Sequence, residues 1–219
     1  MSISENLQEI KAGLPEGVTL VAISKTRPNE DLLEAYESGH RVFGENKIQE
    51  MTQKWEDLPK DIEWHMVGKV QRNKVKYMAP FVNLVHGVDS LKLLKEIEKE
   101  SAKNERVIDC LLQIKIAEED TKNGMTLDEA KSILNSEEYA EMKHVRVTGF
   151  MGMATLTEDE SKIREEFSYL KTSFDSLAKE VPSLKILSMG MSGDYRLELE
   201  CGSNMVRIGS AIFGERNYN

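Results

Sequence analysis

A lysine stands directly behind an apolar segment near the start of the chain. The segment VTLVAIS (18–24) is short and rich in β-branched residues, as buried strands are, and Lys25 follows it. A lysine at such a place keeps its stem in the protein interior and its amine at the edge of the core. Partial desolvation favours the neutral amine, which can attack an aldehyde. The alternative is an exposed lysine whose stem lies along apolar surface.

Glycine and serine residues gather at two places near the other end of the chain. Gly190, Ser192 and Gly193 close the apolar segment 185–191 or follow it, and Gly209 and Ser210 lie within the segment 205–213 or just after its strand. Glycines let backbone N–H groups approach an anion, and serine hydroxyls add donors, so these residues could hold a phosphate. The alternative is turn chemistry without a ligand.

An arginine and two histidines also lie within apolar segments. Arg207 alternates with apolar neighbours, so its side chain points either into the molecule or into solvent. A buried guanidinium needs a partner, which could be a ligand acceptor such as a pyridine nitrogen or an acidic side chain. His65 and His86 are weaker candidates, because a lone histidine in a strand is more often a hydrogen-bonded core residue than a catalytic one.

These residues need a scaffold, and the chain alternates short apolar segments with amphipathic ones. Continuous apolar strands are typical of parallel sheets that are covered on both faces. This alternation permits an open doubly wound sheet or a closed barrel, and eight units in 219 residues favour the barrel. We therefore expect an α/β protein over residues 1–219, a single (β/α)8 TIM-type barrel with an extra N-terminal helix and its site at the carboxyl ends of the strands. The predicted strands are 18–24, 41–44, 62–68, 82–88, 107–117, 145–153, 185–191 and 205–213, and the predicted helices are 3–13, 29–39, 45–58, 69–79, 91–102, 126–135, 158–180 and 195–202.

The composition of the chain limits the kinds of partner that it could bind. The chain has 29 Lys and Arg against 38 Asp and Glu, a formal net charge of −9, which opposes binding to nucleic acid or to an anionic membrane surface. Cys110 and Cys201 stand outside any Cys-x-x-Cys or metal-ligand spacing, which indicates two reduced thiols and no metal site. The first residues carry early acidic charge and no long apolar run, and no segment approaches a membrane helix. We expect a cytoplasmic protein.

Several motifs resemble one family along almost the whole chain. The following motifs occur in order and with matching spacing: VAISKTRP (21–28), FGEN followed after two residues by QE (43–50), HMVGKVQRNK (65–74), the loop ending KNG (122–124), GFMGMAT (149–155), LSMGMSGDY (187–195) and GSNMVRIGSAIFGER (202–216). They resemble the pyridoxal 5′-phosphate (PLP) homeostasis proteins, which are stand-alone relatives of the alanine racemase barrel. The resemblance implies PLP as cofactor and the same barrel fold.

The resemblance also implies roles for seven residues and includes an eighth, His65, in its motifs. Lys25 would carry PLP as a Schiff base, with Asn46 beside the cofactor. The phosphate would be held by the two loops that carry Ser192, Gly193, Gly209 and Ser210, and Arg207 would face the pyridine nitrogen. His65 belongs to a family motif without an assigned role. Gly193 departs from the acidic residue usual after SMGMS, and HMVG departs from the commoner HFIG; neither change removes the amine or the phosphate donors.

A carrier of PLP is the function we expect, and a weak amino-acid racemase is the alternative. PLP works as an electron sink when its pyridine nitrogen is protonated, and a guanidinium, which only donates, keeps that nitrogen unprotonated. Related racemases resemble two-base catalysts whose second base comes from a β-rich domain, and the six residues after the last predicted strand, 214–219, are too few to form one. We expect a monomer without robust turnover that stores, buffers or delivers PLP, with PLP-dependent apo-enzymes as candidate recipients. A barrel that binds no PLP is the remaining alternative.

Overall fold

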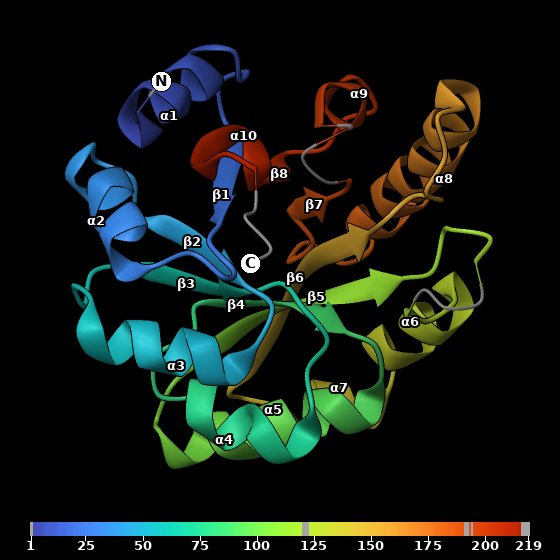
Figure 1. The fold of residues 1–219 in the computed structure, drawn as a ribbon. Helices are drawn as coiled ribbons and strands as arrows, with labels where there is room; N and C mark the ends of the chain where they lie inside the picture. The colour runs from blue at the N-terminus through green and yellow to red at the C-terminus, as the bar shows by residue number, and fades with distance from the viewer. Residues whose placement is uncertain (1, 120–122, 191–192, 194, 216–219) are drawn as a thin grey trace.

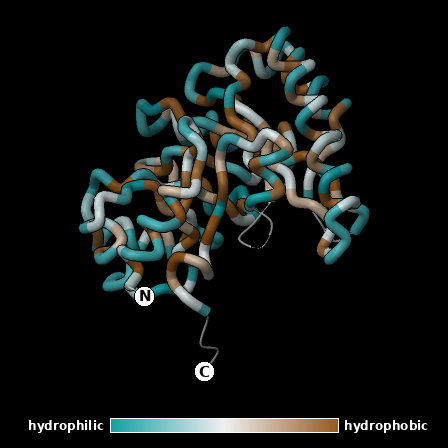
Figure 2. Tube along the Cα trace, turned by 90° about the horizontal axis from the view of Figure 1, so that it is seen from above, coloured by the Kyte–Doolittle hydropathy of each residue, from teal (hydrophilic) through white to brown (hydrophobic). Residues whose placement is uncertain are grey.

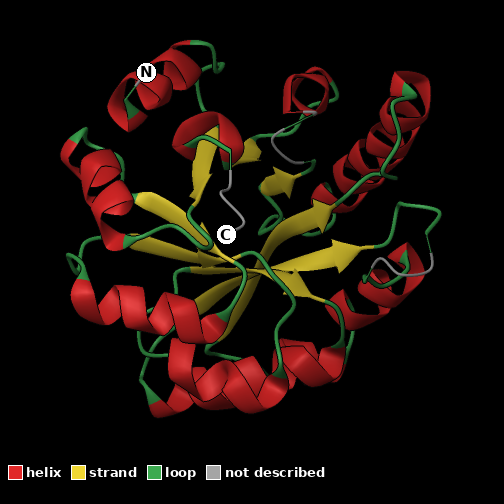
Figure 3. Ribbon diagram, viewed as in Figure 1, coloured by secondary structure: helices red, strands yellow, loops and turns green. Residues whose placement is uncertain are grey.

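Eight parallel strands close into a barrel in which each strand pairs with its neighbours in chain order (Figures 1 and 3). The computed structural model describes residues 2–119, 123–190, 193 and 195–215. The closing pair joins the first strand to the last, with Val21 opposite Arg207. The strands are β1 (Thr19–Ile23), β2 (Val42–Glu45), β3 (Glu63–Met66), β4 (Leu84–Val88), β5 (Ile108–Ile114), β6 (Val145–Gly152), β7 (Ile186–Ser188) and β8 (Met205–Ile208). The expected fold class is confirmed.

Helices surround the strands and cover the outer face of the barrel (Figure 1). The N-terminal helix α1 starts with a capping box in which Ser2 accepts from the Glu5 amide and the Glu5 side chain accepts from the Ser2 amide. The helices are α1 (Ile3–Ala12), α2 (Asn29–Glu37), α3 (Ile48–Asp57), α4 (Val75–Met78), α5 (Leu91–Lys103), α6 (Leu127–Leu134), α7 (Glu137–Ala140), α8 (Glu160–Ala178), α9 (Tyr195–Glu200) and α10 (Ser210–Phe213). In this described part of the chain α1 packs against α10 and α2.

The strand residues divide into two apolar layers because successive side chains point to opposite faces. The larger layer lies between strands and helices and includes Phe43, Trp64 and Phe150. The smaller layer fills the interior of the barrel and consists of Val21, Leu84, Leu111, Met151 and Met205 with their neighbours. In Figure 2 hydrophobic residues recur along the central strands, whereas hydrophobic and hydrophilic residues alternate along the outer helices. This alternation decides which residues beyond each strand face the barrel mouth.

Several predicted elements differ from the structure. The last predicted strand, 205–213, ends at Ile208, and residues 210–213 form the short helix α10 instead. Gly209 interrupts the extended run, so an apolar segment that looked continuous turns out of the sheet. The predicted helix 69–79 is a 3-10 turn, Arg72–Lys74, followed by the single-turn helix α4. Helix α7 was not predicted, because Glu137–Ala140 is too short to show a period.

Candidate functional site

A cavity of about 690 Å³ opens at the carboxyl end of the barrel strands. The interior positions of β1 and β2 lead into it, because Lys25 continues the alternation of Val21 and Ile23, and Asn46 continues that of Val42 and Gly44. The residues that line the cavity come from most strand ends: Ile23, Lys25, Asn46, Val67, Gly68, Lys69, Gln113, Asn123, Met153, Gly193, Arg207, Gly209, Ser210 and Glu215. Six of the eight predicted site residues meet here: Lys25, Asn46, Gly193, Arg207, Gly209 and Ser210.

Lys25 sits in a turn whose backbone is fixed on both sides. The preceding residue, Ser24, is fully buried, and its amide donates to the Gly44 carbonyl at 3.0 Å. The following residue, Thr26, has a φ of 62°, a left-handed conformation that β-branched residues rarely adopt. The Thr26 amide donates to Glu50 Oε1 at 2.5 Å. Lys25 therefore leaves the strand at a defined angle toward the cavity.

Arg207 points into the barrel and is only 5% exposed. Its Nη2 donates to the carbonyl oxygens of Gly190 at 2.5 Å and Gly152 at 3.2 Å, and Nη1 donates to Ser188 Oγ at 3.3 Å. These acceptors belong to the ends of β6 and β7, so the guanidinium ties three neighbouring strands together beneath the cavity. The inward orientation decides between the two directions that the sequence left open.

Residues that follow β7 and β8, namely Gly193, Gly209 and Ser210, line the cavity. Gly190 has a φ of 65°, which glycine adopts without strain, and the space beside Gly193 is open. A Cβ on Gly209 would approach the Ile23 carbonyl oxygen to 3.2 Å, so the strand end packs closely beside the residues that lead to Lys25. Ser210 follows at the first turn of α10. Ser192, the remaining predicted phosphate residue, lies outside the described residues.

His65 is not brought to this cavity. It lines a separate hollow of about 380 Å³ with residues such as Thr19 and Asp109, which belong to the amino ends of their strands. His65 Nδ1 and His86 Nε2 are 3.1 Å apart in the barrel interior, so one ring donates to the other. Burial lowers the pKa of His65 to about 3. Both rings are neutral core groups near neutral pH, which is the alternative that the sequence had offered for them.

The sequence missed four polar residues of the cavity. Lys69 Nζ donates to Asn123 Oδ1 at 3.0 Å, and Gln113 Nε2 donates to the Asn123 carbonyl at 2.9 Å. These bonds hold Asn123 at the cavity, and Glu215 borders the cavity as well. Gln113 could have been found, because a polar side chain on an interior position of an apolar strand needs a reason. Lys69 and Asn123 lie in loops, where no period points to a face.

Two other kinds of site find no support among the residues that the structure describes. No cluster of three or more His, Cys, Asp or Glu side chains there could hold a metal ion. Within the same ranges, every helix is too short or too polar to cross a bilayer. The charged side chains that line the cavity are the amines of Lys25 and Lys69, the Arg207 guanidinium and the Glu215 carboxylate.

Comparison with known proteins identifies the class of barrel first. Residues 1–217 match the family model of the alanine racemase N-terminal domain. Alanine racemase from Clostridium difficile shares the fold, with a TM-score of 0.80 at 15% identity, and this chain covers 58% of it. PipY from Synechococcus elongatus aligns more fully. Its structure with PLP bound has a TM-score of 0.88 at 31% identity, and the alignment covers 97% of this chain and 100% of PipY.

Curated relatives then define the family. The pyridoxal phosphate homeostasis protein of Aquifex aeolicus is 40% identical over 202 residues, which cover 91% of this chain and 87% of the relative. The one from Pasteurella multocida is 34% identical over 240 residues, covering 100% of both chains. The chain belongs to the pyridoxal phosphate homeostasis protein family, and the resemblance of its motifs is confirmed.

Proposed function

We propose that this protein binds PLP through a Schiff base on Lys25 and serves PLP homeostasis as a carrier without robust turnover. The observation that carries the proposal is one cavity that joins Lys25 to the ends of β7 and β8, with Arg207 between them. An amine, a guanidinium and a set of backbone amides match the aldehyde, the ring nitrogen and the phosphate of PLP. The family and the PLP-bound relative support the same ligand.

The residues of the cavity divide the work of holding PLP. Lys25 supplies the amine that bonds to the aldehyde carbon. Gly193, Gly209 and Ser210, together with Ser192, offer amides and hydroxyls for the phosphate. Asn46 follows β2, the strand that pairs with β1, and so lies beside Lys25 in the cavity. His65 has no part in this proposal, because it lines a different hollow.

Arg207 supports the role of carrier. PLP supplies an electron sink for carbanions when its ring nitrogen is protonated. A guanidinium is a donor only and stays charged, so Arg207 would bond to an unprotonated nitrogen and weaken that sink. The ties from Arg207 to Gly152, Ser188 and Gly190 keep its position fixed. A weak racemase remains the rival, and a cytoplasmic carrier that hands PLP to apo-enzymes is the role we propose.

The test uses apo-protein and PLP. Titration should produce a visible absorbance band, and borohydride reduction followed by peptide mapping should find the cofactor on Lys25. Lys25→Ala should lose the reducible linkage. Lys69→Ala is the matched control, because it removes another amine of the same cavity and should keep the linkage.

Single-enantiomer alanine separates carrier from enzyme. The loaded protein should leave L-alanine and D-alanine without rapid inversion, as measured by chiral chromatography. Efficient inversion by the wild-type chain that disappears in Lys25→Ala would favour the racemase. A reducible linkage that persists in Lys25→Ala, or a colourless wild-type protein, would contradict the proposal itself.

A further inference from the structure

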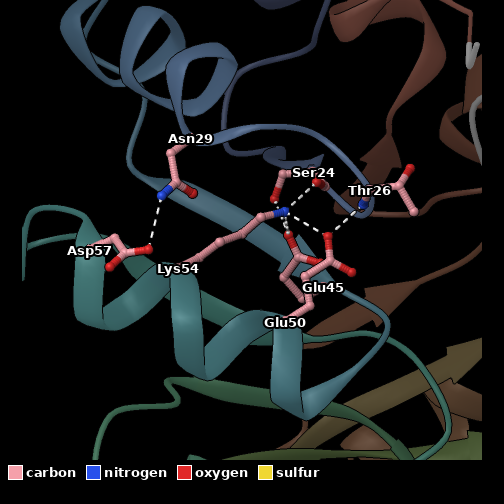
Figure 4. A network of polar contacts seen from close by, with 7 residues as sticks. All are labelled: Ser24, Thr26, Asn29, Glu45, Glu50, Lys54 and Asp57. Atoms are coloured by element: carbon pink, nitrogen blue, oxygen red, sulfur yellow. Dashed lines mark hydrogen bonds and ion pairs between the residues drawn. The ribbon is translucent and has the colours of Figure 1, made fainter.

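A second lysine, which unlike Lys25 is buried, lies beneath the site. Lys54, on the face of α3 that packs against the barrel, has a side chain only 6% exposed. Its Nζ donates to the Ser24 carbonyl at 2.7 Å, to Glu45 Oε1 at 2.7 Å and to Glu50 Oε1 at 2.8 Å (Figure 4). An ammonium has three N–H donors, so these three bonds use all of them.

Two of the three partners of Lys54 directly precede a residue that faces the cavity. The Ser24 carbonyl belongs to the peptide that leads into Lys25, and the Ser24 hydroxyl donates to Glu45 Oε1 at 2.7 Å. Glu45 directly precedes Asn46, and the barrel alternation sends the two side chains to opposite faces. The ammonium thus holds the outer side of β1 and β2 at the level where their inner side forms the site.

The same network reaches beyond Lys25. Glu50 Oε1 accepts from Lys54 and also from the Thr26 amide, which belongs to the residue after Lys25. Thr26 is held at a φ of 62°, which a β-branched residue adopts only when its surroundings impose it. Hydrogen bonds therefore hold the backbone on both sides of Lys25. The Lys54 ammonium bonds directly to the Ser24 carbonyl, and it is linked through Glu50 to the Thr26 amide (Figure 4).

The placement of these charges needs a reason other than stability. A buried ion pair recovers its desolvation cost only with good geometry, and apolar residues of similar volume often serve stability equally well. Glu45 has a fully buried side chain, and burial raises its pKa. A charged group held at this cost, next to the proposed reactive amine, is suited to fixing the direction in which that amine leaves the strand.

We propose that Lys54, Glu45 and Glu50 are positioning residues that set the orientation of the Lys25 amine in the cavity. The proposal rests on the proposed function for the identity of the aldehyde, and on the backbone contacts for the positioning itself. Lys54→Met removes all three donors while keeping the length of the stem. Glu50→Ala removes the acceptor of the Thr26 amide, and Glu50→Gln retains an oxygen at that place.

The first measurement needs no PLP. Competitive labelling of the apo-protein with acetic anhydride, read by mass spectrometry, gives the reactivity of Lys25 relative to exposed Lys92. Lys54→Met and Glu50→Ala should change that ratio severalfold, and Glu50→Gln should restore most of the wild-type ratio. Hydrogen exchange at the Thr26 amide should speed up in Glu50→Ala.

The second measurement is PLP affinity, which should fall by about tenfold or more in Lys54→Met, because misplaced reacting groups are costly. Leu93→Ala is the control, since it opens a buried position on α5 away from the cavity and lowers the melting temperature alone. Unchanged Lys25 labelling in Lys54→Met and Glu50→Ala would overturn the proposal, as would equal changes in Leu93→Ala. If the wild-type chain takes up no PLP, the proposed function fails, and the labelling still decides the positioning role. If Lys54→Met does not fold, the two Glu50 variants decide it.

Discussion

The close approach of two strand ends at the cavity makes Gly68→Ala a sharp perturbation. A Cβ on Gly68 would lie 2.3 Å from the Asn46 carbonyl oxygen and 2.8 Å from the Asn46 Cα. Both contacts are with backbone, so no side-chain rotation can relieve them. The oxygen would have to retreat by about 0.7 Å to reach even 3.0 Å, below which real Cβ contacts essentially never fall. Asn46 faces the cavity beside Lys25, so this retreat distorts the proposed site.

The expected magnitudes follow from that displacement. Overpacking costs about 1–3 kcal/mol of unfolding free energy. A shift approaching 1 Å at a site of covalent attachment costs up to about 10²-fold, so PLP affinity should fall by about 10- to 100-fold. Absorbance titration with PLP measures the affinity, and urea unfolding of the apo-protein measures the stability.

Gly17→Ala is the matched control for this variant. Gly17 has a φ of 83° with open space around it, and it precedes β1 at the opposite end of the barrel. Alanine there should cost about 1 kcal/mol through backbone strain and leave PLP affinity unchanged. Gly68→Ala with wild-type PLP affinity would refute the reasoning, because the cavity would then tolerate displacement of Asn46. An equal loss of affinity in both variants would refute it too.

Two further predictions concern the buried basic side chains of His40 and Arg207. Burial, with Lys11 nearby, lowers the pKa of His40 to about 4 from 6.5, so the unfolded chain takes up a proton that the folded chain refuses. Stability is therefore lost as pH falls from about 6.5 toward 4, and the shift corresponds to about 3 kcal/mol, of which about 2 kcal/mol should appear between pH 7 and pH 5. His40→Gln can still donate to the Val42 carbonyl, and urea unfolding at both pH values should show a loss smaller by that amount; an equal loss would exclude His40 as the cause. Arg207→Met should cost about 2–5 kcal/mol, because buried carbonyls of Gly152 and Gly190 lose their charged donor, and thermal unfolding that matches wild type would contradict the buried ties.

The alternation of apolar residues, with eight units, favoured the barrel over an open sheet and placed several candidate residues at strand ends. Strand side chains alternate between two faces. The side chain of Lys25, behind VTLVAIS, therefore shares a face with Val21 and Ile23, and that of Arg207 points away from the face of Val206 and Ile208. Strand order then brought Lys25 and Arg207 together, because β1 closes the barrel against β8 with Val21 opposite Arg207. Sequence alone left the direction of Arg207 open, since an alternating pattern does not say which face is the interior.

The predictions that differ from the structure depend on tertiary packing, which the local sequence pattern does not contain. His65 lies within β3 and lines the hollow at the amino ends of the strands, whereas Gly68, three positions later in the same motif, lies beyond β3 and lines the cavity. The strand predicted over 205–213 was too long because Ala211, Ile212 and Phe213 are apolar for another reason: they form α10, which packs against α1. An apolar run does not reveal whether sheet or helix buries it.

The network around Lys54 shows why a site can be only half visible in a sequence. Lys54 occupies a helix of charged residues, where the pattern indicates a solvent-exposed face, and its role depends on contacts 30 positions back along the chain. Ser24 and Glu45 look like ordinary neighbours of Lys25 and Asn46 until the barrel turns them to its outer side. A barrel strand thus carries two sets of information in alternate residues: inward residues meet the ligand, and outward residues fix the backbone that aims them. Reading the inward set predicts what binds, and only the packed helices show what holds it in place.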